Sequence, residues 1–298
     1  MTTAARATFF LPPADNHVAP GPALLNGDWD LSPQQVGLYM NYHAARNRRN
    51  AVLSRRQGVC TFAAPPLAGR LPTDVSPPRA ALNSFFRFAA EALFPAFQGR
   101  DVTIVDIGCG GAPCLEFFEA AGYRGLYIGI DIKRKASWTD EPTAAFRKQL
   151  VLGNVLTLDV GALPPIDLLI SSTALEHIQN DAAAIARLAT RLRADGAQVH
   201  YVPGEGALPL YGPHGWRQYS PRCLRALFPT GRIFRAGGPC SSLVHRVCIT
   251  QPSRKNRKTL MVRSPKRYAV ARNVALRLDC LLGNRPATMY GVISGPGV

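Results

Sequence analysis

Residues 102–113 read VTIVDIGCGGAP, and this stretch decides the fold. Residues 102–105 are β-branched and mostly apolar, which predicts a buried parallel strand. Asp106 ends this strand, and the glycines at 108, 110 and 111 follow, where backbone N–H groups can approach a ligand because no Cβ stands in the way. A helix is expected over residues 113–121, with proline tolerated in its first turn. Strand, glycine turn and helix in this order predict the nucleotide-binding arrangement of open α/β sheets.

The glycine turn differs from two common phosphate-binding motifs. A dinucleotide fingerprint needs Gly or Ala where this chain has Pro113, and no lysine follows as in a phosphate-binding loop. What remains is an acidic-x-Gly-x-Gly pattern from Asp106 to Gly110 at the end of a strand. In this pattern the chain resembles the class I S-adenosylmethionine (SAM) methyltransferases, and the alternative is an ordinary strand-to-helix turn.

A second acidic residue supports a nucleotide site. The run GLYIGID over residues 125–131 predicts another strand that ends in Asp131, 21 residues after Gly110. A ribose-binding acid occurs at about this spacing in nucleotide-binding βαβ units. One carboxylate can accept hydrogen bonds from both ribose hydroxyls, and the alternative is a solvent-exposed acid at the end of a strand.

The loop after the fourth expected strand makes the resemblance more specific. Residues 167–171 read DLLIS, and residues 171–181 read SSTALEHIQND. This looks like the small-molecule methyltransferases that carry an L-E-H motif. The Asn/Asp-Pro-Pro-aromatic motif of enzymes that methylate DNA bases or protein amides is missing here, and so is the Pro-Cys pair of cytosine C5 enzymes. Asn154 departs from the family pattern, which typically has an Asp that accepts from the adenine amino group, although its side-chain carbonyl can also accept.

The resemblance implies a fold and a set of cofactor contacts. The fold is a Rossmann-like, seven-stranded, mostly parallel sheet with helices on both faces, a helical N-terminal extension and an insertion before the last strand. SAM is the implied cofactor, with Asp131 at the ribose and with Asn154 or the backbone of Val155 at the adenine. The other expected cofactor-binding residues, at the methionine end or along the strand ends, are Asp106, Gly108, Cys109, Gly110, Ile132 and Ser171.

The L-E-H motif and a later loop supply the candidates for catalysis and acceptor binding. His177 can take a proton near pH 7, and Glu176 can orient it; the alternative is that both close the pocket floor, because methyl transfer needs little beyond in-line positioning. Residues 204–219 form a long loop of the kind that is usually functional. Its candidate substrate-binding residues are Tyr211, His214 and Trp216, with Arg217 and Tyr219 as further candidates for a substrate wall.

The remaining elements are read from periodicity and caps. Ser32 and Gln35 predict a capping box that opens a helix through about residue 50, and residues 78–97 predict a core helix. Further expected elements are a loose tail over 1–30, a Pro-rich linker over 64–79, helices over 143–147, 181–194 and 220–228, and strands over 148–152, 198–202, 232–236 and 287–294, with Gly196 as a helix cap. The expected domains are an N-terminal part over 1–79 and a methyltransferase domain over 80–298 with a basic insertion over 237–286.

Composition limits the class of protein and its partners. The 298 residues, 47% of them hydrophobic, suffice for a proper core, and the net charge of +16 favours anionic partners or simply reflects arginine-rich usage. Val270, Val274, Leu278 and Leu281 form a helical stripe within the basic insertion, which predicts either a packed helix with a solvated basic face or contact with an anionic lipid, a polysaccharide carrier or nucleic acid. Seven scattered cysteines without a C-x-x-C pair argue against disulfides and zinc, so no metal site is expected.

Together these patterns predict a SAM-dependent methyltransferase. It would move a methyl group to an oxygen or nitrogen of a small-molecule, lipid or glycan acceptor, in the cytoplasm or peripherally at a membrane surface. No apolar run reaches the length of a transmembrane helix, and no secretory leader is expected. The alternatives are an RNA-modifying methyltransferase, suggested by the charge, and a non-catalytic binding module with a SAM fold.

Overall fold

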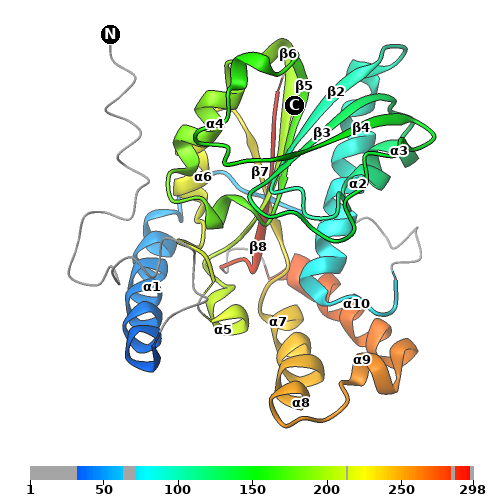
Figure 1. The fold of residues 1–298 in the computed structure, drawn as a ribbon. Coiled ribbons are helices and arrows are strands. Elements are labelled where there is room, and N and C mark those ends of the chain that lie inside the picture. The colour runs from blue at the N-terminus through cyan, green and yellow to red at the C-terminus, as the bar shows by residue number, and fades with distance from the viewer. Residues whose placement is uncertain (1–31, 63–71, 213, 283–285, 296–298) are drawn as a thin grey trace.

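A mixed β-sheet with helices on both faces forms the centre of the protein (Figure 1). The structure is a computed structural model that describes residues 32–62, 72–212, 214–282 and 286–295. The expected tail over 1–30 and the first half of the expected Pro-rich linker, residues 64–71, lie outside the described residues. In these residues the strands are β1 (Cys60–Thr61), β2 (Val102–Ile107), β3 (Gly125–Asp131), β4 (Phe146–Leu152), β5 (Ile166–Ser172), β6 (Leu192–Pro203), β7 (Arg232–Ala236) and β8 (Met289–Ser294).

The strand order changes direction at β2, the strand that leads into the glycine turn. The order is β1-β7-β8-β6-β5-β2-β3-β4, and β8 alone among these strands runs antiparallel to its neighbours. From β2 the chain builds outward through β3 and β4 on one side and through β5 and β6 on the other. Ligands of open α/β sheets bind where the order reverses, outside the carboxyl ends of the strands. The ends of β2, β3 and β5 are therefore the expected place for a ligand.

The helices surround the sheet on both faces and at one end (Figure 1). They are α1 (Pro33–Leu53), α2 (Pro77–Phe97), α3 (Leu115–Ala120), α4 (Asp181–Ala189), α5 (Leu208–Tyr211), α6 (Pro221–Leu227), α7 (Pro239–His245), α8 (Gln251–Arg254), α9 (Leu260–Arg263) and α10 (Pro265–Leu281). Buried side chains of α2 and α3 pack on one face of the sheet, and those of α4 and α6 pack on the other. The Rossmann-like fold is confirmed, with the seven expected strands present and the two-residue β1 added at the edge beside β7.

One expected helix is absent, and another ends earlier than expected. The chain over 143–147 turns instead of forming a helix, because the Thr143 hydroxyl accepts from the Phe146 amide at 2.9 Å and β4 begins at Phe146. The helix expected over 181–194 ends at Ala189. Backbone groups just beyond it bond to the sheet, since the Ile166 amide donates to the Arg191 carbonyl at 2.8 Å. Gly196 consequently lies inside β6 and does not cap a helix.

Helix α1 packs over the loop that follows β6. Its capping box is confirmed, since Gln35 N donates to the Ser32 hydroxyl and Ser32 N donates to the Gln35 side chain. The Tyr39 hydroxyl donates to the Gly215 carbonyl at 2.5 Å and accepts from the His214 amide at 3.0 Å. The N-terminal helix therefore supports the segment in which the acceptor-binding residues were expected. The domain boundary between residues 79 and 80 stays a prediction.

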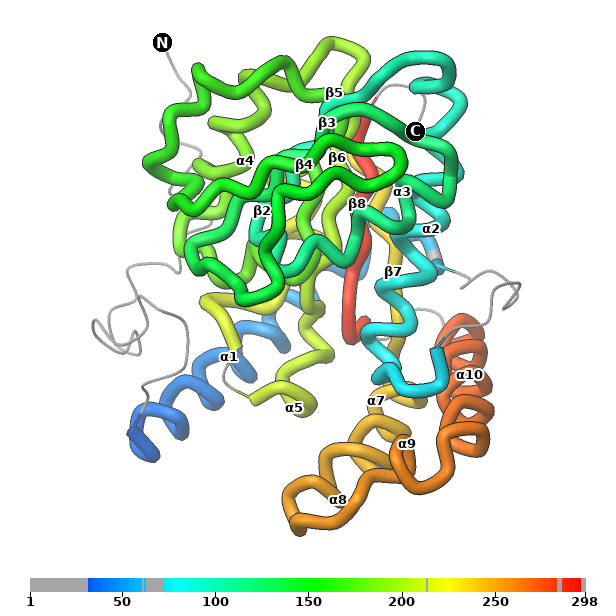
Figure 2. The backbone as a smooth tube through the Cα atoms, turned by 45° about the vertical axis from the view of Figure 1, so that its right-hand side comes forward, coloured from blue at the N-terminus to red at the C-terminus, as the bar shows by residue number. Residues whose placement is uncertain are grey.

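The insertion before β8 forms a helical lobe below the sheet. Figures 1 and 2 show α7, α8, α9 and α10 together at the end of the molecule, with α10 beside the first part of α2. The Asp279 carboxylate accepts from the backbone amides of Cys240 and Ser241 at 2.8 and 2.9 Å, which ties α10 to the start of α7. No helix in the described part of the chain combines the length and apolarity needed to cross a membrane.

The apolar stripe of α10 faces solvent. Val270, Val274, Leu278 and Leu281 are 46–81% exposed. The buried face of the helix consists instead of Tyr268, Ala269, Arg272, Ala275, Leu276 and Asp279. The helix is thus packed, as one of the two alternatives predicted, and Lys266, Arg267 and Arg277 are exposed, but the covered face is not the apolar stripe and it includes Arg272.

Candidate functional site

The glycine turn after β2 requires glycine at two positions for different reasons. Gly108 and Gly110 have φ angles of 65° and 53°, in the left-handed region that disfavours side chains. A Cβ on Gly108 would lie 2.4 Å from the Cβ of Ala174, so the turn packs directly against the start of the L-E-H segment. A Cβ on Gly110 would meet nothing within 4 Å. The turn is thus tightly packed at Gly108 and open at Gly110.

Asp131 is oriented by backbone amides on both sides. One carboxylate oxygen accepts from Gly110 N at 2.9 Å, and the other accepts from Lys133 N at 2.9 Å. The acid therefore lies beside the glycine turn at the end of β3, as the spacing predicted. Next to it, Ile132 follows the last residue of β3, Leu152 ends the adjacent strand β4, and the two side chains are 67% and 58% exposed. Two exposed apolar side chains beside an oriented carboxylate suit a flat base and its ribose.

Asp106 is a buried carboxyl group under the turn. It is 1% exposed, and burial raises its pKa to about 7, against the opposing effect of a 2.7 Å hydrogen bond from the Tyr127 hydroxyl. Its Oδ1 atom has no hydrogen-bond partner among the residues that the structure describes. A buried polar atom of this kind indicates a ligand group that remains to be supplied.

Four other expected cofactor contacts differ in accessibility. Asn154 is exposed, and its side-chain oxygen accepts from Leu156 N at 2.9 Å, so one of its two acceptor sites is used within the turn. Val155 is buried directly after it. Cys109 and Ser171 are also buried, and the Ser171 hydroxyl lies 2.8 Å from His200 Nδ1. The expected contacts of SAM with the side chains of Cys109 and Ser171 are therefore not supported.

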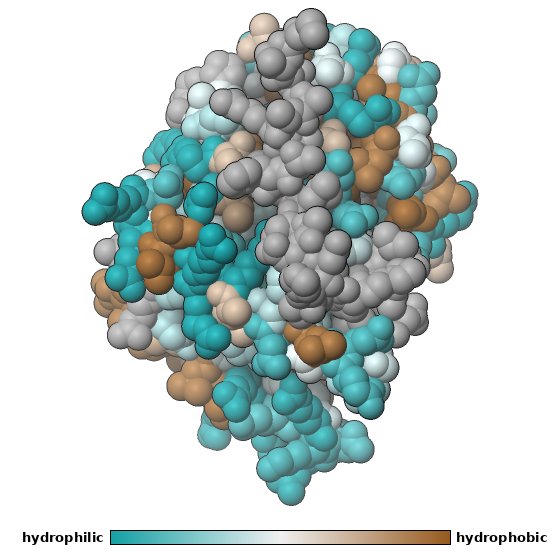
Figure 3. Space-filling view, turned by 90° about the vertical axis from the view of Figure 1, so that its left-hand side faces the viewer, coloured by the Kyte–Doolittle hydropathy of each residue, from teal (hydrophilic) through white to brown (hydrophobic). Residues whose placement is uncertain are grey.

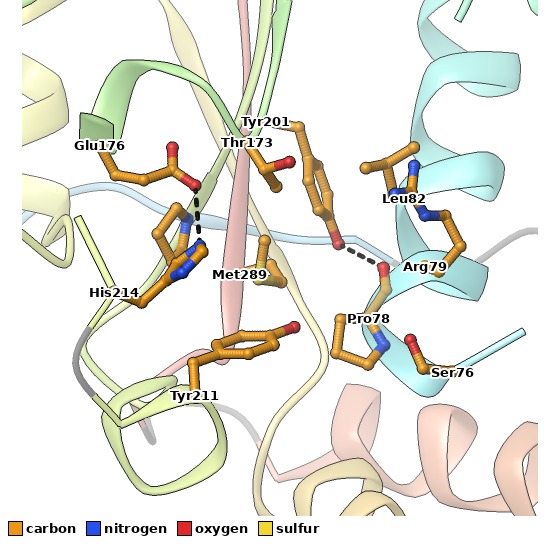
Figure 4. Close-up of a pocket in the computed structure, with 11 residues that line it drawn as sticks. Ser76, Pro78, Arg79, Leu82, Thr173, Glu176, Tyr201, Tyr211, His214 and Met289 are labelled. Atoms are coloured by element: carbon orange, nitrogen blue, oxygen red, sulfur yellow. Dashed lines mark hydrogen bonds and ion pairs between the residues drawn. The ribbon is translucent and has the colours of Figure 1, made fainter. Parts of the chain in front are cut away.

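A cavity of about 210 Å³ opens between α2 and the loop after β6 (Figure 4). Side chains of α2 lie on one side, Tyr211 and His214 lie on the opposite side, and Tyr201 and Met289 lie between them. The residues that line it are Ser76, Pro78, Arg79, Leu82, Thr173, Glu176, Tyr201, Pro203, Tyr211, His214 and Met289. Thr173 has a φ of 51°, which is unusual for a β-branched residue and typical of functional sites.

Three polar side chains meet at one end of this cavity, and two of them, Glu176 and His214, line it. Glu176 and His177 belong to a short 3₁₀ helix (Leu175–His177), and His214 comes from the loop after α5. Glu176 is fully buried, and its Oε1 lies 3.8 Å from His214 Nε2. The rings of His177 and His214 have centroids 4.6 Å apart and are nearly perpendicular. The His214 imidazole therefore contacts both the candidate base, His177, and the Glu176 carboxylate.

The backbone holds these residues in place. Trp216 N donates to the Glu176 carbonyl at 2.7 Å, and a Cβ on Gly215 would lie 2.6 Å from the same oxygen. The two segments thus approach each other as closely as a glycine allows. Burial and the nearby Glu176 charge raise the pKa of Tyr211, so this phenol stays protonated in the neutral range.

Three aromatic or basic residues expected at the substrate wall lie elsewhere. Trp216 is buried and packs with Tyr39 in a separate small core. Arg217 is 3% exposed and forms an ion pair with the fully buried Asp181, to which the Tyr219 hydroxyl also donates at 2.5 Å. These side chains anchor the loop. Tyr211 and His214 do line the cavity, as expected.

Sequence reasoning missed the contribution of α2 and β6 to the cavity. Arg79 lies in the first turn of α2, which had been interpreted as a core helix only. Tyr201 lies near the carboxyl end of β6, and that position was the signal that could have identified it. Met289 begins β8, and no pattern in the sequence pointed to it.

The residues near the glycine turn fit SAM, the cofactor that the resemblance implies. The space around the Cα of Gly110 is open, and Asp106 Oδ1 has no hydrogen-bond donor among the described residues. The oriented carboxylate of Asp131 lies between the turn and the exposed side chain of Ile132. The amino, hydroxyl and aromatic groups of one ligand would match the Asp106 Oδ1 atom, the Asp131 carboxylate and the Ile132 side chain, in that order.

Comparison with known proteins identifies the family. Residues 79–228 match a family model described as a methyltransferase domain, and no curated protein sequence matches the chain. The fold is similar to a SAM-dependent methyltransferase from Archaeoglobus fulgidus (17% identity, 70% of this chain, 94% of that one, TM-score 0.42). It is also similar to 1,6-didemethyltoxoflavin-N1-methyltransferase from Burkholderia thailandensis (16%, 69%, 82%, 0.36) and to N-methyltransferase NodS from Bradyrhizobium japonicum (16%, 53%, 90%, 0.37). These TM-scores are below 0.5, and the assignment rests on the family match. Because that match covers just over half of the chain, the protein belongs to this methyltransferase family and uses SAM as its methyl donor.

Proposed function

We propose that the protein methylates an oxygen or nitrogen atom of a small-molecule, lipid or glycan acceptor that binds in the cavity between α2 and the loop after β6. The supporting observation is the close contact between Gly108 and Ala174. It brings the cofactor turn against the segment that carries Glu176, which lines the cavity, and His177, which lies beside Glu176 and His214. A donor at the turn and an acceptor in the cavity would thus be neighbours, which is the positioning that methyl transfer requires.

The residues at the strand ends divide the binding of the donor among them. Asp131 would accept hydrogen bonds from the ribose hydroxyls, and Asp106 would accept from the amino group of the methionine part. Asn154, the backbone of Val155 and the exposed Ile132 would surround the adenine. Bound SAM supplies a methyl group on a positively charged sulfur.

The cavity lining favours an acceptor with an apolar body and an anionic group. Leu82, Tyr201 and Met289 offer apolar and aromatic surface, and Arg79 offers a guanidinium at the start of α2. Arginine binds carboxylates and phosphates through two parallel hydrogen bonds. The cavity therefore suits a charged small molecule or the head group of a lipid or glycan better than a neutral one.

His177 is the candidate general base. Its imidazole is partly exposed beside the cavity, and it lies in the same short helix as the buried Glu176. As the acceptor atom forms its bond to the methyl carbon, the electrons of the carbon–sulfur bond remain on sulfur, and His177 takes the acceptor proton. His177→Ala should lower turnover with little change in SAM affinity, measured by calorimetry.

A labelled-SAM transfer assay against a fractionated cell extract tests the proposed function. We expect label in a small-molecule, lipid or glycan fraction with the natural protein and none with Asp131→Ala, which lacks the ribose ligand. Val52→Ala is the control, because Val52 is exposed on α1 and does not line the cavity. Label in RNA would contradict the proposed acceptor class. Tight SAM binding with no transfer to any fraction would favour the non-catalytic binding module.

The helical lobe supports a further proposal, that the protein docks on an anionic membrane surface. On α10 the exposed apolar residues are spaced at three and four positions from Lys266, Arg267 and Arg277, which are also exposed. Such residues share one helix face. The lower tip of the molecule, at the α8 end, is uniformly hydrophilic (Figure 3), and its Arg254, Lys255, Arg257 and Lys258 are exposed. Apolar anchors among cations match the interface of an anionic bilayer.

Vesicle binding tests this docking. The protein should sediment with vesicles that contain phosphatidylglycerol and not with pure phosphatidylcholine, and added salt should weaken the binding. Val274→Glu should reduce the bound fraction by repulsion. Val52→Glu, which changes an equally exposed valine on α1, should leave it unchanged. Equal binding to neutral vesicles, or tight salt-sensitive binding to RNA alone, would contradict the proposal.

A further inference from the structure

The geometry points to a divalent transition-metal site formed by Glu176, His177 and His214. One ligand atom from each residue lies within 4.8 Å of the other two. Ligand atoms bound at 2.0–2.2 Å to one ion are about 3.0–3.5 Å apart, so small side-chain rotations are enough to close the site. One of these separations, between Glu176 Oε1 and His214 Nε2, is already 3.8 Å. The inference goes beyond methyl transfer itself, because these three side chains can bind a metal whether or not an acceptor is present.

The ligands come from a preorganised framework. Two of them are adjacent in the short helix after β5, and the third lies on the loop after α5. That loop is fixed to the helix by the bond from Trp216 N to the Glu176 carbonyl, and it is fixed to α1 by the two hydrogen bonds of the Tyr39 hydroxyl. A metal site needs ligands whose backbones are held in advance, since ordering them at the moment of binding costs affinity.

The chemistry of the donor set selects the kind of ion. Two imidazoles and one carboxylate suit zinc, iron, cobalt, nickel or manganese, and they suit magnesium less well, because magnesium prefers oxygen ligands. The carboxylate is fully buried, and a cation beside it would offset the cost of removing its charge from water. The cysteine pattern of the sequence excluded a thiolate zinc site but not this one, since His214 becomes a neighbour of the L-E-H motif only in the folded chain.

The site has an open side that faces the cavity. Glu176 and His214 line the cavity together with Arg79 and Tyr211 (Figure 4). Three protein ligands leave at least one coordination position for water or for an oxygen or nitrogen of a bound molecule. In the metal-bound protein His177 acts as a ligand, and the ion would hold the acceptor atom and lower its pKa.

Metal binding to the untagged, full-length protein tests the inference directly. Cobalt(II) serves as the probe, because its visible absorption reports the coordinating atoms. Calorimetry should show one tight site, and His177→Ala, His214→Ala and Glu176→Gln should each weaken binding by more than about tenfold. His245→Ala is the matched control, because this histidine lies outside the cluster, and it should bind cobalt like the natural protein.

Two readouts separate a failed metal site from a failed function. Thermal unfolding with and without cobalt shows whether each variant is folded, and a folded Glu176→Gln variant keeps the test valid even where an alanine variant unfolds. Binding that is unchanged in the histidine variants, or absent at millimolar cobalt, would overturn the metal site. SAM binding and label transfer are measured separately after chelator treatment. Full transfer in the metal-free protein would show that the ion has no catalytic role. A protein that binds cobalt but neither binds SAM nor transfers label, with or without the metal, would overturn the proposed function and leave the metal result intact.

Discussion

Alanine at Gly108 and at Gly110 should separate the stability of the glycine turn from its ligand binding. Both residues have left-handed φ angles, where a side chain costs about 1–2 kcal/mol, partly offset by a less flexible unfolded chain. Gly110→Ala adds no contact within 4 Å, so its cost in unfolding free energy should be about 1 kcal/mol. Its new methyl group would occupy the open space where the methionine end of SAM is expected, and SAM affinity should fall by more than about tenfold.

Gly108→Ala should act on stability much more strongly. Its Cβ would lie 2.4 Å from the Ala174 Cβ, and such overpacking typically costs about 1–3 kcal/mol beyond the backbone strain. The summed loss of about 2–4 kcal/mol corresponds to a Tm lower by about 4–8 °C in a chain of this size. Ala174→Gly removes the opposing methyl group. The double variant should therefore recover the overpacking part and keep the strain part.

Thermal unfolding and SAM calorimetry check this reasoning on Gly108→Ala, Gly110→Ala, Ala174→Gly and the double variant Gly108→Ala/Ala174→Gly. A Gly108→Ala variant no less stable than Gly110→Ala would refute the close packing of the turn against Ala174. The absence of any recovery in the double variant would do the same. Unchanged SAM affinity in Gly110→Ala would show that the open space at the turn is not part of the donor site.

Three further perturbations test the site and its support. Asp131→Ala should weaken SAM binding more than about tenfold in calorimetry, because an oriented carboxylate is lost; equal affinity would contradict its ribose role. Burial raises the pKa of Asp106 from 3.8 to about 7, so the folded protein binds more protons than the unfolded chain between these values, and stability falls as the pH rises through them. Asp106→Asn should remove this pH dependence. The Tm of the variant minus that of the natural protein should therefore increase from pH 4 to pH 8, and a constant difference would refute the raised pKa of Asp106. Arg217→Met should lower the free energy of unfolding by about 3–5 kcal/mol, because it leaves the buried Asp181 without its ion-pair partner; a loss below about 1 kcal/mol in denaturant titration would contradict this.

The central part of the fold follows from the sequence because its signals are local. The apolar runs that became β2, β3 and β5 each end in a polar residue or a glycine, and the capping box of α1 needs only residues three positions apart. The segment over 143–147 failed because a single threonine hydroxyl forms a turn there, and composition does not reveal this bond.

The periodicity of α10 shows the limit of pattern reading. Equal spacing identifies residues that share a helix face, but it does not say which face the rest of the chain covers. Here the covered face includes Arg272 and Asp279, whose side chains form hydrogen bonds with carbonyl and amide groups of other segments. The exposed face carries the apolar stripe, which no segment in the described residues covers fully.

The candidate site was predictable at the donor end and much less so at the acceptor end. Asp106, Gly110 and Asp131 lie within one βαβ unit, so motif spacing was enough to bring them together. The buried pairs Ser171–His200 and Asp181–Arg217 depend on how separate segments pack, and spacing along the chain does not encode this. The same reason explains why Tyr211 lines the cavity, whereas Arg217, six residues later, pairs with the buried Asp181.

The anchoring of α10 connects the helical lobe to the cavity wall. The Arg272 guanidinium donates to the carbonyls of Pro72 and Val75 at 2.7 and 3.1 Å, and the Tyr268 hydroxyl donates to the Val75 carbonyl at 2.9 Å. Val75 directly precedes Ser76, which caps α2 and lines the cavity. A load applied to the outer surface of α10 must therefore either break these bonds or shift the first turn of α2. The hydrogen bonds from α10 and the lining residue Ser76 thus lie next to each other in the chain, so the anchor of the lobe is directly adjacent to the cavity wall.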